Sequence, residues 1–123
     1  MTGCLRNARA VAEAAMRLGR KISVIPAGER WKDDNTIRFA LKDFIGAGAI
    51  IRYLKGRKSP ESQAAVMVAE HALENLCHIL KTSVSGRELA GLGYEEDTHF
   101  AADVDVSECV PIFRNDSYIM GMG

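Results

Sequence analysis

The sequence carries one convincing strand pattern among four or five helical ones, and this imbalance constrains the fold most. Residues 21–28 form a β-branched run that ends in Pro26 and Gly28, which is typical of a buried strand. Residues 110–113 are a weaker candidate, because Pro111 suits an edge or an irregular segment. A strand alone leaves its backbone N–H and C=O groups unpaired. We therefore expect 21–28 either to pair with another chain or to belong to a larger α/β protein, and the missing strands favour the second.

Helical patterns account for most of the remaining chain. Apolar residues recur at helical spacing over three long stretches, 5–18, 36–54 and 60–81. A Ser-x-x-Glu capping box from Ser85 predicts a fourth, short helix. One or two further turns are expected at 95–102, and the last residues, 121–123, are expected to fray.

The helix predicted at 36–54 contains two glycines, Gly46 and Gly48. Glycine in a helix interior costs about 1 kcal/mol relative to alanine. Two of them together therefore predict either the close approach of another backbone or a break in the helix.

Length and charge exclude several classes of function. The 123 residues suit one domain, with 16 basic and 16 acidic side chains, and this balance speaks against nucleic acid or an anionic membrane as partner. We find no apolar signal sequence and no apolar run near the ~20 residues that span a membrane. Three widely spaced cysteines, Cys4, Cys77 and Cys109, form no metal or redox motif. We expect a cytoplasmic protein with reduced thiols.

The turn after the predicted strand carries the first candidate site residues. Ligands of open α/β sheets bind beyond the carboxyl ends of the strands. Gly28 lets backbone amides approach such a ligand, Glu29 can hold a divalent cation, and Arg30 can hold a phosphate or a sulfonate. The alternative is a polar loop with a surface ion pair, since loops are polar in any case.

Asp43 adds a carboxylate on the apolar side of the second predicted helix, close to its two glycines. Mg²⁺ takes one or two carboxylates together with waters and phosphate oxygens, so Glu29 and Asp43 form a candidate pair. The alternative is an exposed acid that pairs with Lys42 or Arg38.

Two further places offer polar groups for chemistry. Arg6 and Asn7 open the first predicted helix, where free amides and the macrodipole favour an anion, although plain capping explains them equally well. The acidic run 95–97 lies close to His99, and Asp97 in this run is a candidate for metal binding or acid/base work.

Four segments, in this order, resemble the C-terminal half of the 2-phosphosulfolactate phosphatase family. They are 3–12 (GCLRNARAVA), 25–30 (IPAGER), 42–50 (KDFIGAGAI) and 93–102 (GYEEDTHFAA), the last followed by Asp105 and Val110-Pro111. The resemblance implies a three-layer α/β/α fold. It makes residues 1–123 a single, helix-rich domain with few strands, the C-terminal part of a longer phosphatase.

The resemblance also implies a chemistry: Mg²⁺-dependent hydrolysis of 2-phosphosulfolactate, a step toward coenzyme M, or of a similar small anionic phosphate monoester. The implied roles are metal binding by Glu29 and Asp43, catalysis by Asp43 and Asp97, and substrate binding by Arg6, Asn7, Gly28 and Arg30. One departure is Lys42, which stands where the family has glutamate. The alternative function is a non-catalytic association or small-anion-binding domain that completes its sheet with another subunit, and we expect a homo-oligomer.

Overall fold

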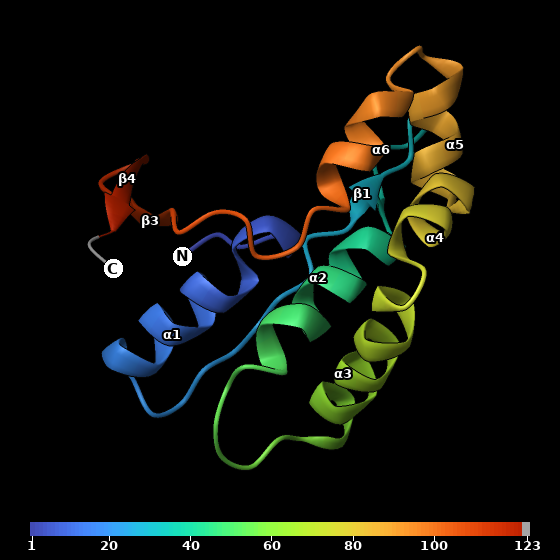
Figure 1. Cartoon of the computed structure of the whole chain (residues 1–123). Helices are drawn as coiled ribbons and strands as arrows, with labels where there is room; N and C mark the ends of the chain where they lie inside the picture. The colour runs from blue at the N-terminus through green and yellow to red at the C-terminus, as the bar shows by residue number, and fades with distance from the viewer. Residues whose placement is uncertain (122–123) are drawn as a thin grey trace.

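The computed structural model describes residues 1–121, and this part of the chain contains one 3₁₀ helix, six α-helices and four short strands. The helices are η1 Leu5–Asn7, α1 Ala8–Leu18, α2 Leu41–Ile51, α3 Pro60–Leu73, α4 Leu76–Thr82, α5 Val84–Gly91 and α6 Glu95–Ala101 (Figure 1). The strands form two separate antiparallel pairs, β1 Glu29–Arg30 with β2 Ile37–Arg38, and β3 Val110–Arg114 with β4 Ser117–Gly121. A mixed fold, rich in helix and with few strands, is thereby confirmed, whereas the three-layer arrangement stays a prediction.

The core forms where α2 lies between α1 and α3 (Figure 1). Ile45 and Ala49 of α2 and Ala69 of α3 are all fully buried. A Cβ added to Gly48 would lie 2.0 Å from the carbonyl oxygen of Ala65, so the two backbones are closer than any side chain permits. Close backbone approach is thus confirmed as the role of Gly48, and α2 continues unbroken through both glycines.

The single helix predicted at 60–81 is wrong, because the chain forms two helices, α3 and α4. Asn75 lies between them with φ −145° and ψ 47°, outside the helical region. After this break, α4 turns away from α3 and gathers with α5 and α6 into a second helical group (Figure 1). The break lets α3 pack on α2 while α4 packs on α5 and α6.

The buried strand predicted at 21–28 is also wrong. The segment is extended, but it belongs to no strand, and Ile25 is 85% exposed. Within the described residues, no backbone–backbone hydrogen bond involves residues 20–27. The physical reason is that no other segment lies beside it to form a ladder, so the β-branched pattern has no sheet to join.

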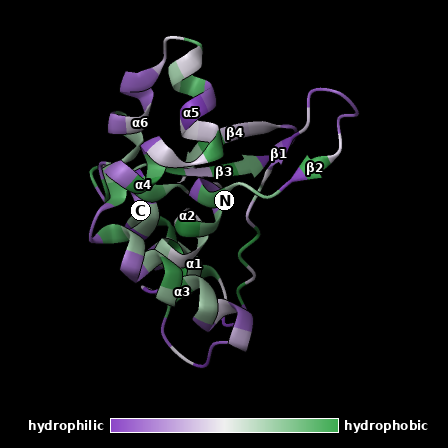
Figure 2. Ribbon diagram, turned by 90° about the vertical axis from the view of Figure 1, so that its right-hand side faces the viewer, coloured by the Kyte–Doolittle hydropathy of each residue, from purple (hydrophilic) through white to green (hydrophobic). Residues whose placement is uncertain are grey.

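The helix predicted at 36–54 begins five residues later than expected. Ile37 and Arg38 form β2 instead, and Ile37 and Phe39 are 67% and 70% exposed. The β1–β2 ladder and its hydrophilic connecting loop extend away from the helices (Figure 2). Pairing with β1 therefore takes these residues out of the helix.

The weak strand candidate at 110–113 is confirmed as β3. Its partner is β4, a strand that the sequence pattern did not predict. Asn115 and Asp116 link the two strands, with φ values of 48° and 61°. Two successive left-handed residues make the two-residue turn that suits a twisted hairpin. Of the residues 121–123 that were expected to fray, Gly121 instead ends β4, and 122–123 lie outside the described residues. Within residues 1–121, no helix has the length and apolarity to cross a membrane.

Candidate active-site groove

A groove of about 690 Å³ is lined by the N-terminal residues and η1, the extended segment 22–27, residues of α1 and α2, the end of α6 and one residue of β4. Two of the predicted site residues, Arg6 and Asp43, line it together, although 37 positions separate them in the chain. Gly46 lines the same groove, and a Cβ added there would meet nothing within 4 Å. The two glycines of α2 thus differ: Gly48 admits α3, whereas Gly46 leaves open space in the groove.

Arg6 is held in the groove wall by α6 and the residues that follow it. Its Nη1 donates to the carbonyl oxygen of Phe100 at 2.7 Å and to Oδ2 of Asp103 at 2.9 Å. The guanidinium carbon also lies 3.6 Å from the centre of the Phe100 ring. Both hydrogen bonds use one nitrogen, and a guanidinium carries five N–H donors, so Arg6 can bind an anion without losing them.

Asp43 is a half-buried carboxylate on the first turn of α2. Burial raises its pKa above the ordinary aspartate value, and the negative charge of Glu29 adds to the effect. The charge of Lys42 and a hydrogen bond from the backbone N–H of Gly28 oppose this rise in pKa without cancelling it. The neighbours of Asp43 therefore balance its negative charge only in part, and a cation beside Asp43 in the groove would be stabilised.

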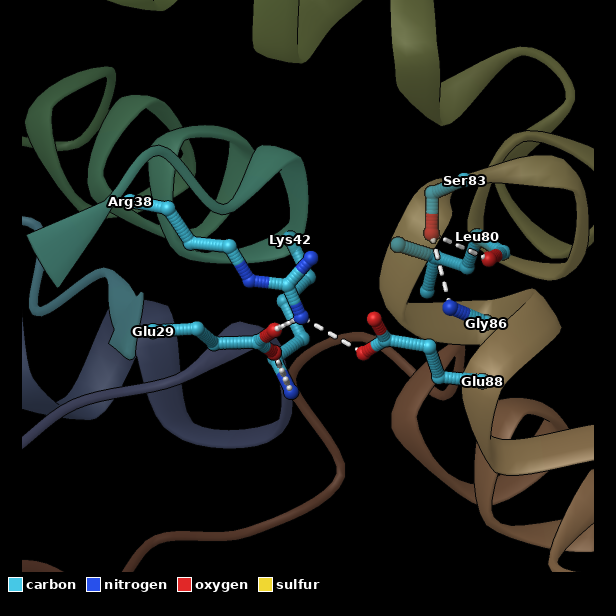
Figure 3. A network of polar contacts seen from close by, with 7 residues as sticks. All are labelled: Glu29, Arg38, Lys42, Leu80, Ser83, Gly86 and Glu88. Carbon is cyan, nitrogen blue, oxygen red and sulfur yellow. Dashed lines mark hydrogen bonds and ion pairs between the residues drawn. The ribbon is translucent and has the colours of Figure 1, made fainter. Parts of the chain in front are cut away.

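Glu29, the other predicted metal ligand, is already paired with two cations. Its carboxylate lies 2.7 Å from Arg38 Nη2 and 2.8 Å from Lys42 Nζ (Figure 3). Burial alone would raise the pKa of Glu29, but hydrogen bonds from Lys42 and Ser85 and the two positive charges hold it below its ordinary value. The lysine that departs from the family pattern is thus a direct partner of this carboxylate.

Arg38 extends the pairing to α5 and closes a four-residue charge network. Its Nη2 also contacts Oε2 of Glu88 at 2.5 Å, and only 10% of the Arg38 side chain is exposed. The α5 end of the network is firmly placed, because Ser83 Oγ accepts the backbone N–H of Gly86 at 3.1 Å and donates to Leu80 (Figure 3). Ser83, not the predicted Ser85, is therefore the cap of this helix, and Ser85 is buried beside Glu29.

The remaining predicted site residues lie elsewhere. Asn7 is buried, and its amide accepts from the backbone of Cys4 and donates to that of Cys109, each at 2.8 Å. Arg30 donates to the carbonyl oxygen of Asn35 in the β1–β2 loop, at 2.6 Å, and its side chain is exposed. Asp97 is exposed on α6. None of the three lines the groove, so their roles in catalysis or substrate binding stay predictions.

Gly28 lies at the carboxyl end of the extended segment with φ of 74°. A Cβ there would meet the carbonyl oxygen of Arg38 at 2.8 Å, so a larger residue would push β2 aside. Its contribution is the backbone N–H that reaches Asp43.

The carboxylates at the groove can be compared with the ligands that Mg²⁺ takes in proteins. Within residues 1–121, no three His, Cys, Asp or Glu side chains gather closely enough to hold a metal by themselves. Mg²⁺ needs fewer protein ligands, because it keeps waters and takes oxygens from phosphate. Asp43 and the neighbouring Glu29 could supply the one or two carboxylates that Mg²⁺ needs. Glu29 would then have to give up its ion pair with Lys42.

Sequence reasoning missed the partners that position these groups. Glu88 and Asp103 lie 50 and 97 positions from the arginines they bind. No local spacing marks such pairs, so only the folded chain identifies them.

An arginine and a half-buried carboxylate that line one groove are the kinds of group that contact a small anion and a cation. Comparison with known proteins gives the family: the 2-phosphosulpholactate phosphatase family model matches residues 1–116. The chain therefore belongs to the 2-phosphosulfolactate phosphatase family.

Individual relatives agree with the family match. The chain is 33% identical over 116 residues to a 2-phosphosulfolactate phosphatase of Methanothermobacter thermautotrophicus, covering 94% of this chain and 48% of the relative. It is 34% identical over 114 residues to one of Methanocaldococcus jannaschii, covering 93% and 46%. A probable 2-phosphosulfolactate phosphatase of Carboxydothermus hydrogenoformans is 33% identical over 113 residues, covering 90% and 45%. The chain spans about half the length of these relatives.

Proposed function

We propose that this chain forms part of a Mg²⁺-dependent phosphatase that hydrolyses 2-phosphosulfolactate or a similar small anionic phosphate monoester. The observation that carries the proposal is that Arg6 and Asp43 line the same groove in a chain of this family. The relatives' names suggest the substrate, and the positive Arg6 and negative Asp43 on one groove support an anionic ester bound together with a cation.

Each residue has a role that follows from its surroundings. Arg6, steadied by Phe100 and Asp103, holds the phosphate or the sulfonate of the ester. Asp43 holds Mg²⁺, with Glu29 as its second carboxylate. The metal, when bound, neutralises charge on the phosphoryl oxygens. Lys42 pairs with Glu29 and would be free to contact the anion if Glu29 held the metal.

The first experiment measures phosphate release from 2-phosphosulfolactate by this chain, with and without Mg²⁺. We expect release that depends on the metal, and a drop of about a hundredfold for Asp43→Asn, because that change removes the charge that would bind the metal. Asp33→Asn is the matched control, since Asp33 is exposed in the β1–β2 loop and does not line the groove. No release together with no binding of 2-phosphosulfolactate would contradict the proposal.

Stability measurements separate a catalytic loss from unfolding. The raised pKa of Asp43 means that its ionisation costs folding free energy as the pH rises through that pKa. Asp43→Asn should therefore have a higher melting temperature than the parent chain at about pH 7, and no such gain at about pH 3. A lower melting temperature at neutral pH would show that lost activity reflects lost structure.

A second candidate function is the non-catalytic association domain, favoured by the exposed and unpaired segment 20–27. Such a domain would pair this segment with a strand of another subunit. It would assemble in sedimentation experiments and yet release no phosphate, which distinguishes it from the phosphatase.

A further inference from the structure

A thiol and an imidazole meet outside the groove, between α4 and α6. Cys77 Sγ lies 3.3 Å from Nδ1 of His99, although 22 positions separate the two residues. Cys77 is half-buried and His99 is exposed, so solvent and small solutes reach the pair. A thiolate, not a thiol, is the nucleophile, and an adjacent histidine is the usual group that takes its proton.

An ion pair joins the same two helices that carry the thiol and the imidazole. Lys81 is four residues after Cys77 on α4 and so lies on the same face. Its Nζ lies 3.4 Å from Oε1 of Glu95, which is four residues before His99 on α6. In the part of the chain that the structure describes, no carboxylate forms an ion pair with His99. The α4–α6 interface therefore places an imidazole against the sulfur, and the ammonium group of Lys81 pairs with Glu95 across the same interface.

We propose that Cys77 is a reactive thiol, with His99 as its base, and that low-molecular-weight disulfides modify it. The Cys77 thiol passes its proton to His99, and the thiolate attacks one sulfur of the disulfide. The new Cys77 S–S bond forms as the old disulfide bond breaks. The departing thiolate takes a proton from the imidazolium, so one thiol and one disulfide are exchanged for another pair.

Accessibility alone predicts a different order of reactivity. Cys4 and Cys109 are both exposed, whereas Cys77 is half-buried. Neither exposed thiol has an imidazole contact among the described residues. A faster reaction at the least exposed cysteine would therefore report the histidine and not solvent access.

Modification of Cys77 reaches the groove through the next residue along α6. Phe100 follows His99, and its carbonyl oxygen and ring both hold Arg6. A mixed disulfide at Cys77 adds a group beside His99, one residue from the Phe100 carbonyl oxygen and ring that hold Arg6. This consequence, unlike the reactivity itself, rests on the proposed function.

The experiment treats the full chain with oxidised glutathione at about pH 7 and follows each cysteine by peptide mass spectrometry. We expect Cys77 to be modified first, faster than the more exposed Cys4 and Cys109. His99→Asn should lower the rate at Cys77 about tenfold at about pH 7.

His78→Asn is the matched control, because His78 neighbours Cys77 on α4 and is exposed, and it should leave the rate unchanged. The proposal is overturned if Cys77 reacts no faster than Cys109, or if His99→Asn has no effect in a folded chain. Should His99→Asn unfold the chain, as seen by circular dichroism, the order of reaction among the three cysteines of the parent decides. A rate at Cys77 no higher than the rates at Cys4 and Cys109 rejects the proposal.

Discussion

The α2–α3 contact and the segment 20–39 are held in place by opposite means. At the contact, Gly48 lets the α3 backbone within 2.0 Å of where a Cβ would stand, and the surrounding side chains are fully buried. Along the segment, Ile25, Ile37 and Phe39 are 67–85% exposed. Its side chains reach the helices through the charge network from Glu29 and Arg38 to Lys42 and Glu88. Two apolar contacts add to this network, since Val24 packs against the core and the ring of Phe39 lies 5.6 Å from that of Phe44.

The difference teaches where stability and function reside in this chain. Shape complementarity between backbones tolerates almost no added volume, because interiors are packed to near-crystalline density. A charge network tolerates rearrangement more readily, since its partners can exchange ions or water. The groove lies between the two regions, with rigid α2 on one side and the adaptable segment on the other.

The largest expected effect is that of Gly48→Ala. The added Cβ would overlap the carbonyl oxygen of Ala65, and we expect a loss of about 3 kcal/mol in the free energy of unfolding, measured with urea. Gly46→Ala is the matched control in the same helix, where the Cβ meets nothing within 4 Å. It should stabilise by roughly 0.5–1 kcal/mol through helix propensity. Equal effects of the two changes would show that the α2–α3 approach is not tight.

An intermediate effect is expected for Arg38→Met, which leaves Glu29 and Glu88 without their shared cation. We expect a loss of about 2 kcal/mol in the free energy of unfolding, because the arginine side chain is largely buried and both its hydrogen bonds are charge-assisted. Arg30→Met, in the exposed strand of the same ladder, should change stability by less than about 0.5 kcal/mol.

The pH dependence sharpens this prediction. Because the network lowers the pKa of Glu29, its stabilisation is present above the ordinary value of 4.5 and is lost as the pH falls through the lower, folded-state value. The deficit of Arg38→Met should therefore shrink in acid. A deficit that stays constant with pH would mean that packing of the arginine stem, and not its charge, holds the segment.

The smallest effect is expected for Ile25→Lys. With 85% of Ile25 exposed, the free energy of unfolding should change by less than about 0.5 kcal/mol. Ile45→Ala, at a fully buried position of α2, should cost about 2–5 kcal/mol in the same assay. A large loss at Ile25 would break the comparison, because it would mean that the segment is covered in solution, as self-association would cause.

Prediction from sequence succeeded where the signal is local. The helix at 5–18 and the start of a helix at residue 60 follow from apolar spacing, and close backbone approach at Gly48 was one of the two alternatives that the glycine pair predicted. The sequence prediction failed at 21–28, because a β-branched run indicates only that a strand is possible and not that a partner strand is present. It also missed β4, although Asn115-Asp116 is a usable turn signal.

The candidate site divides in the same way. Arg6 and Asp43 were identified as chemically suitable residues, and their side chains are indeed on one groove. Asn7 was an equally reasonable choice by sequence, but its amide is taken up by the backbone of Cys4 and Cys109. Which polar side chain keeps free donors depends on what the rest of the chain brings beside it.

By itself, the sequence determined the helical content, the small-residue face of α2 and the family to which the chain belongs. These three depend on residue spacing, side-chain volume and the order of motifs along the chain, and not on contacts between distant segments. Only the tertiary structure decided which charges meet. The pairing of Arg38 with Glu88, of Arg6 with Asp103 and of Cys77 with His99 each joins residues far apart in the chain. The physical reason is that such contacts form only after helices pack, and helix packing is set by the shapes of whole faces and not by the neighbours of any one residue.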